Sequence, residues 1–305
     1  FREEFHTLDK WTQNSWDSNS AEFELGRGEF YGDKDASMAL MTTRDASYYT
    51  ITSQFPEFQT LNSALVIQYS VKHEQDIDCG GGYIKLYPSL QDLNAVKGGL
   101  DETKYNIMFG PDLCGSTNKV HMILNYKGHN VEQHTSPGWV NDRFTHLYTF
   151  SLRPDGSYEF FLDMKSIKRG QLKEDWPFLK PKTIVDPDVS KPEDWVDNKM
   201  MNDPTDIKPV GWDDVKEQIL DEDATQPDDW DIEDDGEWEA PLIDNTEFKG
   251  SWQANQVSNP LYNGEWQHPL IPNPDFVDDD TIGKYKFGAI GFELWQVKAG
   301  SAFDS

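Results

Sequence analysis

Apolar and polar residues alternate along several stretches of the chain. The stretch 65–73, LVIQYSVKH, places Ile67, Tyr69 and Val71 on one side of an extended backbone and mostly polar residues on the other. The stretch 119–128, KVHMILNYKG, repeats this alternation. A period of two predicts a β-strand with one buried face, so we expect both stretches to be strands.

Strand-like patterns also flank a turn and return near the end of the chain. Pro154, Asp155 and Gly156 separate two apolar runs, which predicts a β-hairpin. The stretch 287–297, FGAIGFELWQV, is again typical of a strand. Many strands with little helical periodicity predict an all-β chain that folds as an antiparallel two-sheet sandwich.

The stretch 79–88, CGGGYIKLYP, places three glycines directly before an expected strand. Glycine weakens a strand, so this run predicts that another backbone or a ligand comes close there. After the glycines, Tyr83 and Lys85 fall on one face while Ile84 and Leu86 fall on the other. If the aliphatic pair faces the core, the outward tyrosine and lysine offer the aromatic and polar contacts that suit a sugar. An ordinary exposed strand surface is the alternative.

Charge narrows the range of partners. The chain has 55 acidic and 27 basic residues, a formal net charge of −28. Such a charge repels nucleic acid and anionic membrane surfaces, so we expect neither as a partner. No apolar run approaches the ~20 residues of a membrane span. No charged and apolar leader opens the chain, so we expect any secretion signal to have been removed.

Most of this charge lies in the segment 184–280, which contains 28 acidic residues against five lysines, and 10 of the 17 prolines. Tryptophans recur regularly within it. Three units of one kind are followed by three of a second kind, with tryptophans at Trp195, Trp212 and Trp230, then at Trp238, Trp252 and Trp266. Repeats that cannot bury their own apolar residues must stack or pair. Their order predicts a hairpin arm in which the first unit faces the last, whereas a disordered acidic linker is the alternative.

The chain has two cysteines, Cys79 and Cys114. Both lie beside glycines at the edges of expected strands, and neither has the spacing of a metal ligand. We therefore favour a structural disulfide over two free buried thiols, and with it an oxidising compartment. Closure of this loop could stabilise the fold by about 4 kcal/mol.

Three features together resemble the calreticulin and calnexin family of lectin chaperones. They are KHEQDIDCGGGYIKLYP, the pair YNIMFGPDLCG and KVHMILNYKG, and the two sets of tryptophan repeats. The resemblance covers essentially the whole chain, and three repeats of each kind fit the calreticulin branch. It implies a legume-lectin-like (concanavalin A-like) β-sandwich at residues 1–183 and 281–305. An inserted proline-rich arm, the P-domain, would occupy 184–280, and the acidic tail of the family lies outside this sequence.

The resemblance also implies a function. Members are calcium-binding lectin chaperones of the endoplasmic reticulum lumen, so Ca2+ is the expected cofactor, and the cell surface or secretion are alternative locations. They bind monoglucosylated N-glycans on folding glycoproteins. Their arm tip recruits an oxidoreductase of the protein disulfide isomerase family and a prolyl isomerase. We expect a monomer that is not an enzyme.

The motifs of the family assign the glycan-contacting residues. These are Tyr83, Lys85, Tyr105, Met108, Asp112, Ile123, Glu293 and Trp295. The family usually has aspartate where Glu293 stands, so this acceptor is expected to be displaced. Tyr105 and Met108 cannot share a face of a regular strand, so a bulge or a loop contact is required. Cys79 and Cys114 match the disulfide of the family's lectin domain.

Two further sites follow from the resemblance. Calcium in the lectin domain would be bound by Glu4, by the backbone carbonyls of Ala36 and Met38, and by Asp304. The arm tip would dock its partner through Glu233, Asp235, Glu237 and Trp238. The alternative function is a calcium-buffering scaffold without a working lectin site. A secreted β-sandwich glycosidase is a third candidate, but it would need a carboxylate pair that the sequence does not supply.

Overall fold

The computed structural model describes residues 1–99, 102–138, 140–230 and 236–305. The chain divides into two compact units, which are considered separately below. The first consists of Phe1–Pro181 together with Pro274–Ser305, and the second of Lys182–Asn273. The expected insert, residues 184–280, therefore extends past the end of the second unit.

Nine strands form one sheet of the first unit within the described ranges, in the order β1-β5-β21-β7-β9-β10-β11 with β2 beside β5 and β8 between β21 and β9. The strands are β1 (Thr12–Gln13), β2 (Ser20–Ala21), β5 (Ser47–Gln59), β7 (Cys79–Gly81), β8 (Ile84–Tyr87), β9 (Ile107–Cys114), β10 (Thr117–Tyr126), β11 (His129–Glu132) and β21 (Lys286–Gln296). All pairings are antiparallel apart from that of β2 with β5.

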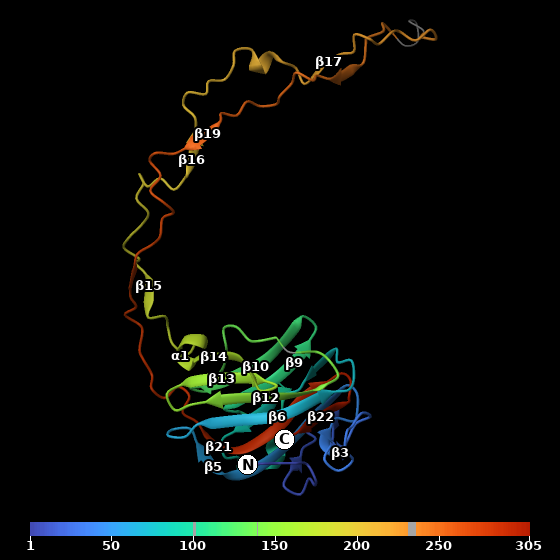
Figure 1. The fold of residues 1–305 in the computed structure, drawn as a ribbon, viewed down its shortest axis with the longest axis vertical. Coiled ribbons are helices and arrows are strands. Elements are labelled where there is room, and N and C mark those ends of the chain that lie inside the picture. The colour runs from blue at the N-terminus through green and yellow to red at the C-terminus, as the bar shows by residue number, and fades with distance from the viewer. Residues whose placement is uncertain (100–101, 139, 231–235) are drawn as a thin grey trace. The chain divides into compact units, whose positions relative to one another are not determined.

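In the part of the chain that the structure describes, seven strands form the second sheet, in the order β14-β13-β12-β6-β22-β4-β3. They are β3 (Glu24–Gly26), β4 (Ala39–Met41), β6 (Leu65–His73), β12 (Thr145–Leu152), β13 (Ser157–Leu162), β14 (Lys165–Gln171) and β22 (Ser301–Asp304). Two short helices in the described residues of this unit are α1 (Leu172–Asp175) and the 3-10 helix η1 (Leu93–Ala95). The two sheets lie face to face, as the ribbon of Figure 1 shows. The all-β sandwich predicted from the alternating pattern is thus confirmed.

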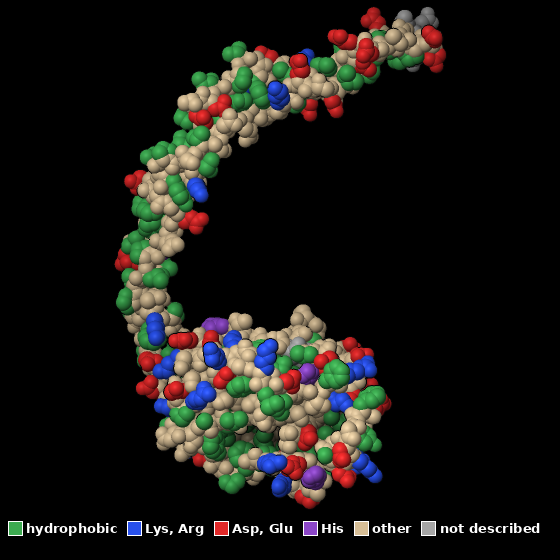
Figure 2. Space-filling model, viewed as in Figure 1, with side chains coloured by type: hydrophobic (Ala, Val, Ile, Leu, Met, Phe, Trp, Pro, Cys, Tyr) green, Lys and Arg blue, Asp and Glu red, His purple; other side chains and the backbone are tan. Residues whose placement is uncertain are grey.

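The core lies between the two sheets and is rich in aromatic residues. On β6 the side chains of Ile67, Tyr69 and Val71 are buried, as their alternation predicts. The indole of Trp176, just after α1, is also buried and donates a hydrogen bond to the carbonyl of Met122 at 2.9 Å. On the visible face of this unit, acidic and basic side chains are interspersed (Figure 2).

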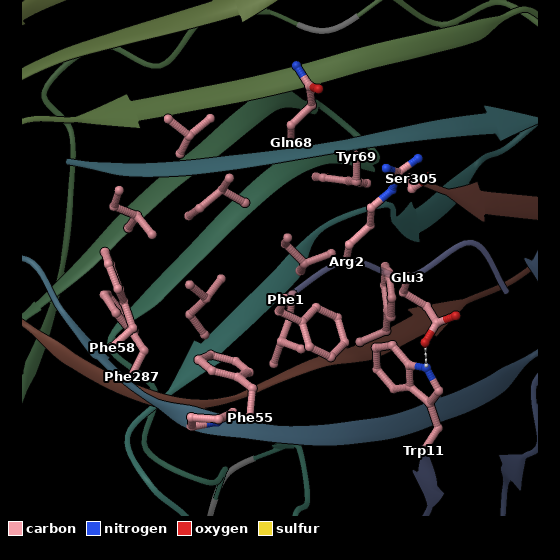
Figure 3. Close-up of a pocket in the computed structure, with 18 of the residues that line it drawn as sticks. Phe1, Arg2, Glu3, Trp11, Phe55, Phe58, Gln68, Tyr69, Phe287 and Ser305 are labelled. Carbon is pink, nitrogen blue, oxygen red and sulfur yellow. Dashed lines mark hydrogen bonds between the residues drawn. The ribbon is translucent and has the colours of Figure 1, made fainter. Parts of the chain in front are cut away.

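A cavity of about 950 Å3 opens into this core. Its lining includes Phe55, Phe58 and Phe287, and the N-terminal residues Phe1 and Arg2 lie beside it (Figure 3). The ring centroid of Phe1 lies 5.6 Å from that of Phe55. The cavity is on the inner side of the nine-stranded sheet, away from the face on which a sugar is expected.

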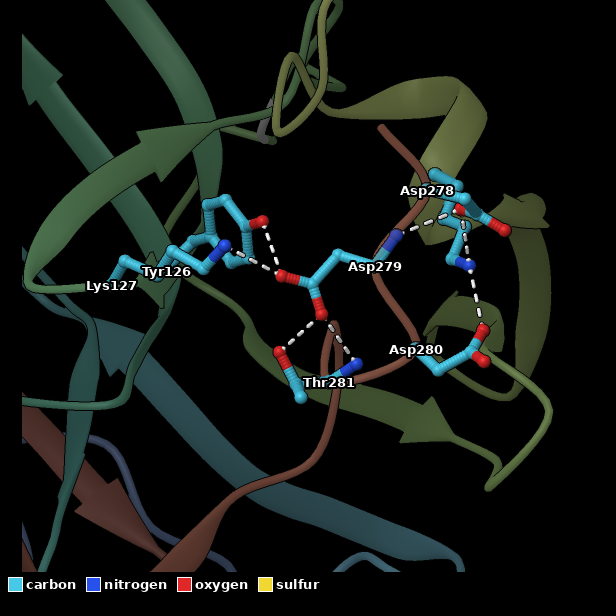
Figure 4. Close-up of polar contacts among 7 residues, drawn as sticks. Tyr126, Lys127, Asp278, Asp279, Asp280 and Thr281 are labelled. Atoms are coloured by element: carbon cyan, nitrogen blue, oxygen red, sulfur yellow. Dashed lines mark hydrogen bonds and ion pairs between the residues drawn. The ribbon is translucent and has the colours of Figure 1, made fainter. Parts of the chain in front are cut away.

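Residues 274–280 belong to the first unit because ion pairs attach them to it. The carboxylate of Asp279 accepts hydrogen bonds from the hydroxyl of Tyr126 and the ammonium of Lys127, each at 2.7 Å (Figure 4). Lys173 contacts the two neighbouring aspartates at 2.7 and 3.2 Å. Hydrogen bonds from Lys127, Thr281 and Tyr126 hold the pKa of Asp279 far below its usual range.

The second unit contains three two-stranded antiparallel ladders within its described residues. They pair β15 (Thr183–Val185) with β20 (Leu270–Pro272), β16 (Met200–Asn202) with β19 (Gln256–Ser258), and β17 (Gln218–Leu220) with β18 (Leu242–Asp244). The 3-10 helix η3 (Trp212–Asp214) lies between β16 and β17. Each ladder joins the first half of the unit to the second half.

Tryptophans of the first repeat set bond to glycines that open repeats of the second set. The indole of Trp195 donates to the carbonyl of Gly264 at 2.8 Å, and that of Trp212 donates to Gly250 at 2.8 Å. Trp230 donates to Gly236 at 3.0 Å. The first repeat of one set therefore contacts the last repeat of the other.

Candidate functional site

The strand β8 separates two clusters of side chains. Ile84 and Leu86 point into the main core between the sheets, as predicted. The alternate side chains face the outer side of the nine-stranded sheet, where a smaller apolar cluster forms. That cluster contains Tyr87, Val96, Tyr105, Met108 and Ala289, with Tyr83, Leu90 and Ile123 packed against it. Four of the predicted glycan-contacting residues thus meet on this outer face.

Strand register brings further predicted residues together. Lys85 on β8 lies opposite Met108 on β9, which lies opposite Ile123 on β10. On the other side of β8, Lys85 pairs with Gly291 of β21, two residues before Glu293. Four adjacent strands therefore present one continuous surface.

Lys85 lies at the centre of this surface, but it is not exposed as the sequence suggested. Only 3% of the residue is accessible. Its ammonium contacts the carboxylate of Glu293 at 2.5 Å and that of Glu102 at 2.8 Å. The ring centroids of Tyr105 and Tyr83 lie 4.8 and 5.9 Å from its nitrogen. Two carboxylates and two rings compensate the charge, which is why a lysine can be buried here.

Glu293 is held against the backbone of a glycine. It is 6% accessible. A Cβ atom added at Gly98 would lie 1.7 Å from its Oε1, so no side chain fits at position 98 without moving the carboxylate. The chain before this glycine is fixed by the amide of Asn14, which donates to the carbonyl of Val96. Residues 96–98 thus form one wall of the site.

Tyr105 reaches the outer face from a loop. It precedes β9, which begins at Ile107, so it does not follow the alternation of that strand. The intervening Asn106 donates its backbone N–H to the carbonyl of Leu86 at 2.8 Å. Tyr105 thus joins Met108 in the outer-face cluster from a loop, and its contact with a glycan stays a prediction. Burial, with the charges of Glu102 and Glu293, raises the pKa of the Tyr105 phenol.

The other end of the surface contains a second polar cluster. His121 lies between Asp112 and Glu132, with its Nε2 3.0 Å from Asp112 Oδ2 and its Nδ1 3.1 Å from Glu132 Oε1. Lys119 contacts the same carboxylate at 2.7 Å. Burial acts to raise the pKa of Glu132, but the hydrogen bond from Lys119 and the charge of His121 lower it overall. The ring centroid of Tyr83 is 6.0 Å from that of His121.

Three aromatic side chains, Trp295, Tyr48 and Trp16, form a row where β21 pairs with β5. Trp295 packs against Tyr48 with ring centroids 4.5 Å apart, and Tyr48 packs against Trp16 at 4.8 Å. The indole of Trp16 donates to the hydroxyl of Thr50 at 3.0 Å. Because Thr50 lies opposite Glu293, this row lies beside the carboxylate of the site.

Sequence reasoning did not assign two carboxylates of the site. Glu102 is in a loop with no strand pattern, so nothing in its neighbourhood predicts contact with Lys85. Glu132 is on β11, opposite Ile123, and becomes recognisable only once the pairing of β10 with β11 is known. His121 could be found, because it shares the face of Ile123 by simple alternation.

The predicted disulfide between Cys79 and Cys114 is present. The two cysteines lie opposite each other on β7 and β9, and two residues further along Gly81 lies opposite Asp112. A Cβ at Gly82 would approach Pro111 to 3.0 Å. The glycine run therefore allows close packing by neighbouring parts of the protein, and the disulfide fixes it beside Asp112.

Of the predicted calcium ligands, Asp304 ends β22 and lies near enough to Glu4 for the two charges to interact. Phe303 pairs with Leu40 of β4, which brings the following Asp304 alongside the residues after Met38. Burial, and then the negative charge of Glu4, raise the pKa of Asp304. Two neighbouring carboxylates are hard oxygen donors of the kind that a calcium ion prefers. Among the described side chains, no group of three or more His, Cys, Asp or Glu could hold a metal, so backbone oxygens such as that of Ala36 would be needed.

Two of the four predicted docking residues of the arm tip lie within the part of the chain that the structure describes. Glu233 and Asp235 lie outside the described residues. Glu237 is exposed and Trp238 is half-buried. In the parts of the chain that the structure describes, no helix has both the length and the apolar character to cross a membrane.

Comparisons with known proteins show which family the chain resembles. A family model described as the calreticulin family matches residues 7–235 and 232–305. Calreticulin of Dictyostelium discoideum is 48% identical over 304 residues, which cover 97% of this chain and 70% of the relative. Calreticulin of Homo sapiens is also 48% identical, over 100% of this chain and 74% of its own length.

A solved structure gives the same result. The globular domain of T. cruzi calreticulin superposes with a TM-score of 0.69 at 33% sequence identity, covering 100% of this chain and 85% of that one. Calreticulin-type proteins are calcium-binding lectin chaperones of the endoplasmic reticulum and are not enzymes. On its sequence and its fold, this chain belongs to the calreticulin family.

Proposed function

We propose that the outer face of the nine-stranded sheet binds monoglucosylated N-glycans on folding glycoproteins. The observation that carries this proposal is the buried Lys85, which is bonded to Glu102 and Glu293 between the rings of Tyr83 and Tyr105. A cation paired with two carboxylates and bordered by rings offers donors, acceptors and apolar surface within one short span. Those are the contacts that a sugar ring needs for orientation and affinity.

Each group has a distinct part in this binding. The carboxylates of Glu293 and Glu102 accept hydrogen bonds from sugar hydroxyls, while the ammonium of Lys85 donates. The tyrosine rings, with Met108, cover the apolar faces of the sugar. Because these groups are already bonded to one another, little side-chain freedom is lost on binding.

Glu293 functions here although the family usually has aspartate at its position. The extra methylene was expected to displace the acceptor. Its carboxylate nevertheless reaches Lys85 at 2.5 Å, in the space that Gly98 leaves open. We infer that the glycine accommodates the longer side chain and preserves the acceptor.

Calcium would bind at Glu4, Asp304 and the backbone carbonyls of Ala36 and Met38. The negative charge of Glu4, which helps to raise the pKa of Asp304, supports this assignment. A bound calcium ion supplies positive charge that offsets their repulsion. These residues would then connect the N-terminal segment, the loop before β4 and the end of β22.

The second unit would recruit folding partners in the lumen of the endoplasmic reticulum. Glu237 and Trp238, with Glu233 and Asp235, would dock a protein disulfide isomerase family oxidoreductase and a prolyl isomerase. Carboxylates around a half-buried tryptophan suit a basic protein surface. The chain would act as a monomer.

Calorimetric titration tests the lectin function. We expect the calcium-loaded chain to bind a monoglucosylated oligomannose glycan and not its unglucosylated counterpart. Tyr83→Ala should abolish this binding, whereas Tyr262→Ala, which removes a partly exposed tyrosine of the second unit, should leave it unchanged. If a folded chain binds neither glycan, the lectin site is refuted and a calcium-buffering scaffold remains.

A further inference from the structure

We propose that Glu132 is a positioning residue of the glycan site, which acts through a protonated His121 to hold Asp112 and thereby makes glycan affinity depend on pH. This inference rests on the proposed glycan function, in which Asp112 is a contact residue. It assigns a role to two residues, Glu132 and His121, that lie beside the expected contacts rather than among them.

The first argument is hydrogen-bond chemistry. Each ring nitrogen of His121 lies close to a carboxylate oxygen, Nε2 at 3.0 Å from Asp112 and Nδ1 at 3.1 Å from Glu132. An ionised carboxylate only accepts hydrogen bonds, and a neutral imidazole has a single N–H to donate. Both contacts can therefore be hydrogen bonds only if His121 carries two protons and a positive charge.

The second argument is the charge that surrounds the ring. Asp112 approaches from β9 and Glu132 from β11, while the ring of Tyr83 lies edge-on at 6.0 Å. On β10 itself, Lys119 contacts Glu132 at 2.7 Å and neutralises part of its charge. Two carboxylates against one lysine leave a net negative charge around the ring.

The third argument is the position of the cluster. His121 is 8% accessible, so its ring is fixed by these contacts rather than free in solvent. Ile123, an expected glycan contact, lies on the same face of β10 and directly opposite Glu132. Movement of Asp112 or of this ring would therefore change the surface on which the glycan lies.

The proposal predicts the direction in which glycan affinity changes with pH. While His121 is protonated, both carboxylates are held, and Asp112 keeps one orientation. When the ring loses a proton as the pH rises, its single remaining N–H can donate to only one of the two carboxylates. Asp112 then competes with Glu132 for that hydrogen bond and is no longer held in one orientation throughout the population. Glycan affinity should therefore fall as the pH rises through the titration of His121. Removal of the Glu132 charge should move that titration to lower pH.

The experiment compares the wild type, Glu132→Gln and a matched control, Glu57→Gln. Glu57 is an exposed glutamate on β5 of the same sheet, 3.6 Å from Lys286 and outside the site. Nitrogen-15 NMR of the histidine rings of the full chain, without glycan, gives the protonation of His121 from about pH 5 to 8. Calorimetry with the monoglucosylated glycan over the same range gives the affinity.

For the wild type and Glu57→Gln we expect a doubly protonated His121 at low pH and an affinity that falls with its titration. For Glu132→Gln we expect a lower midpoint and an affinity about three- to tenfold weaker near pH 7. An unchanged midpoint in Glu132→Gln, or a singly protonated ring throughout in the wild type, overturns the proposal. So does a shifted midpoint without any change in affinity.

The two measurements, NMR and calorimetry, also distinguish failure of this proposal from failure of the glycan function. If the wild type binds no glycan at any pH while His121 titrates as expected, the glycan function fails and the positioning role fails with it. If the wild type binds glycan with the same affinity at every pH, the glycan function stands and the role of Glu132 is refuted. His121→Gln, which cannot titrate, should bind weakly and independently of pH.

Discussion

The two units of this chain are stabilised in different ways. The first has two facing sheets, and side chains such as Phe109, Phe160 and Phe303 are wholly inaccessible between them. In the second unit, every described residue is at least partly exposed to solvent. Its described part is stabilised by three short β-ladders. Tryptophan indoles of its first half also donate hydrogen bonds to glycine carbonyls of its second half. One unit relies on a shared core, and the other on local pairings.

This difference explains why the buried ion-pair cluster around Lys85 lies in the first unit. A buried cation such as Lys85 needs surroundings that fix its partners, and only a packed sheet provides them. The second unit offers exposed carboxylates that suit weak docking instead. Contacts between neighbouring repeats also make its stability approximately a sum of local terms, whereas damage to the core affects the whole first unit.

The largest expected effect follows from damage to the core. Phe160→Ala removes a ring that packs against Phe109, with centroids 5.8 Å apart. We expect the free energy of unfolding of the first unit to fall by about 4 kcal/mol, measured by urea unfolding with near-ultraviolet circular dichroism. The indole N–H signal of Trp212 should be unchanged in the NMR spectrum. A shift of that signal would show that the units are not independent.

Acid should destabilise the first unit selectively. Burial lowers the pKa of His73 to about 4 from its ordinary value of 6.5. Between these values the unfolded chain binds a proton that the folded chain does not, so stability falls as the pH drops from about 6.5 to about 4. We expect a loss of up to about 3 kcal/mol in urea unfolding at pH 4. His73→Gln should flatten this dependence, and an equally steep slope in that variant would contradict the assignment.

A substitution at the wall of the site should affect binding more than folding. Gly98→Ala places a methyl group where the carboxylate of Glu293 lies. We expect glycan affinity in calorimetry to fall by about tenfold, which corresponds to about 1.4 kcal/mol. Gly32→Ala is the matched control, because a Cβ there meets open space. Equal affinities in the two variants would show that the space beside Gly98 is not needed for glycan binding.

The smallest effect is expected in the second unit. Trp212→Phe removes the indole N–H that donates to Gly250 at 2.8 Å. We expect a local loss of about 1 kcal/mol, seen as faster amide exchange in the ladders β16–β19 and β17–β18. Exchange in β15–β20 should not change. Faster exchange throughout the unit would contradict a purely local stabilisation.

The sequence predicted the sandwich because burial on one face imposes a period of two. It could not predict the burial of Lys85, because its partners Glu102 and Glu293 are distant in the sequence. For the same reason residues 274–280 looked like part of the acidic insert. In the structure their aspartates contact lysines of the first unit, such as Lys127 and Lys173, more than a hundred residues earlier.

The most direct test of the account is the footprint of a monoglucosylated glycan in amide hydrogen exchange of the whole chain. We expect slower exchange in β8, β9, β10 and β21 and in the loop around Gly98, with no change in the second unit. Protection confined to the seven-stranded sheet or to the second unit would contradict the placement of the glycan on the outer face of the nine-stranded sheet.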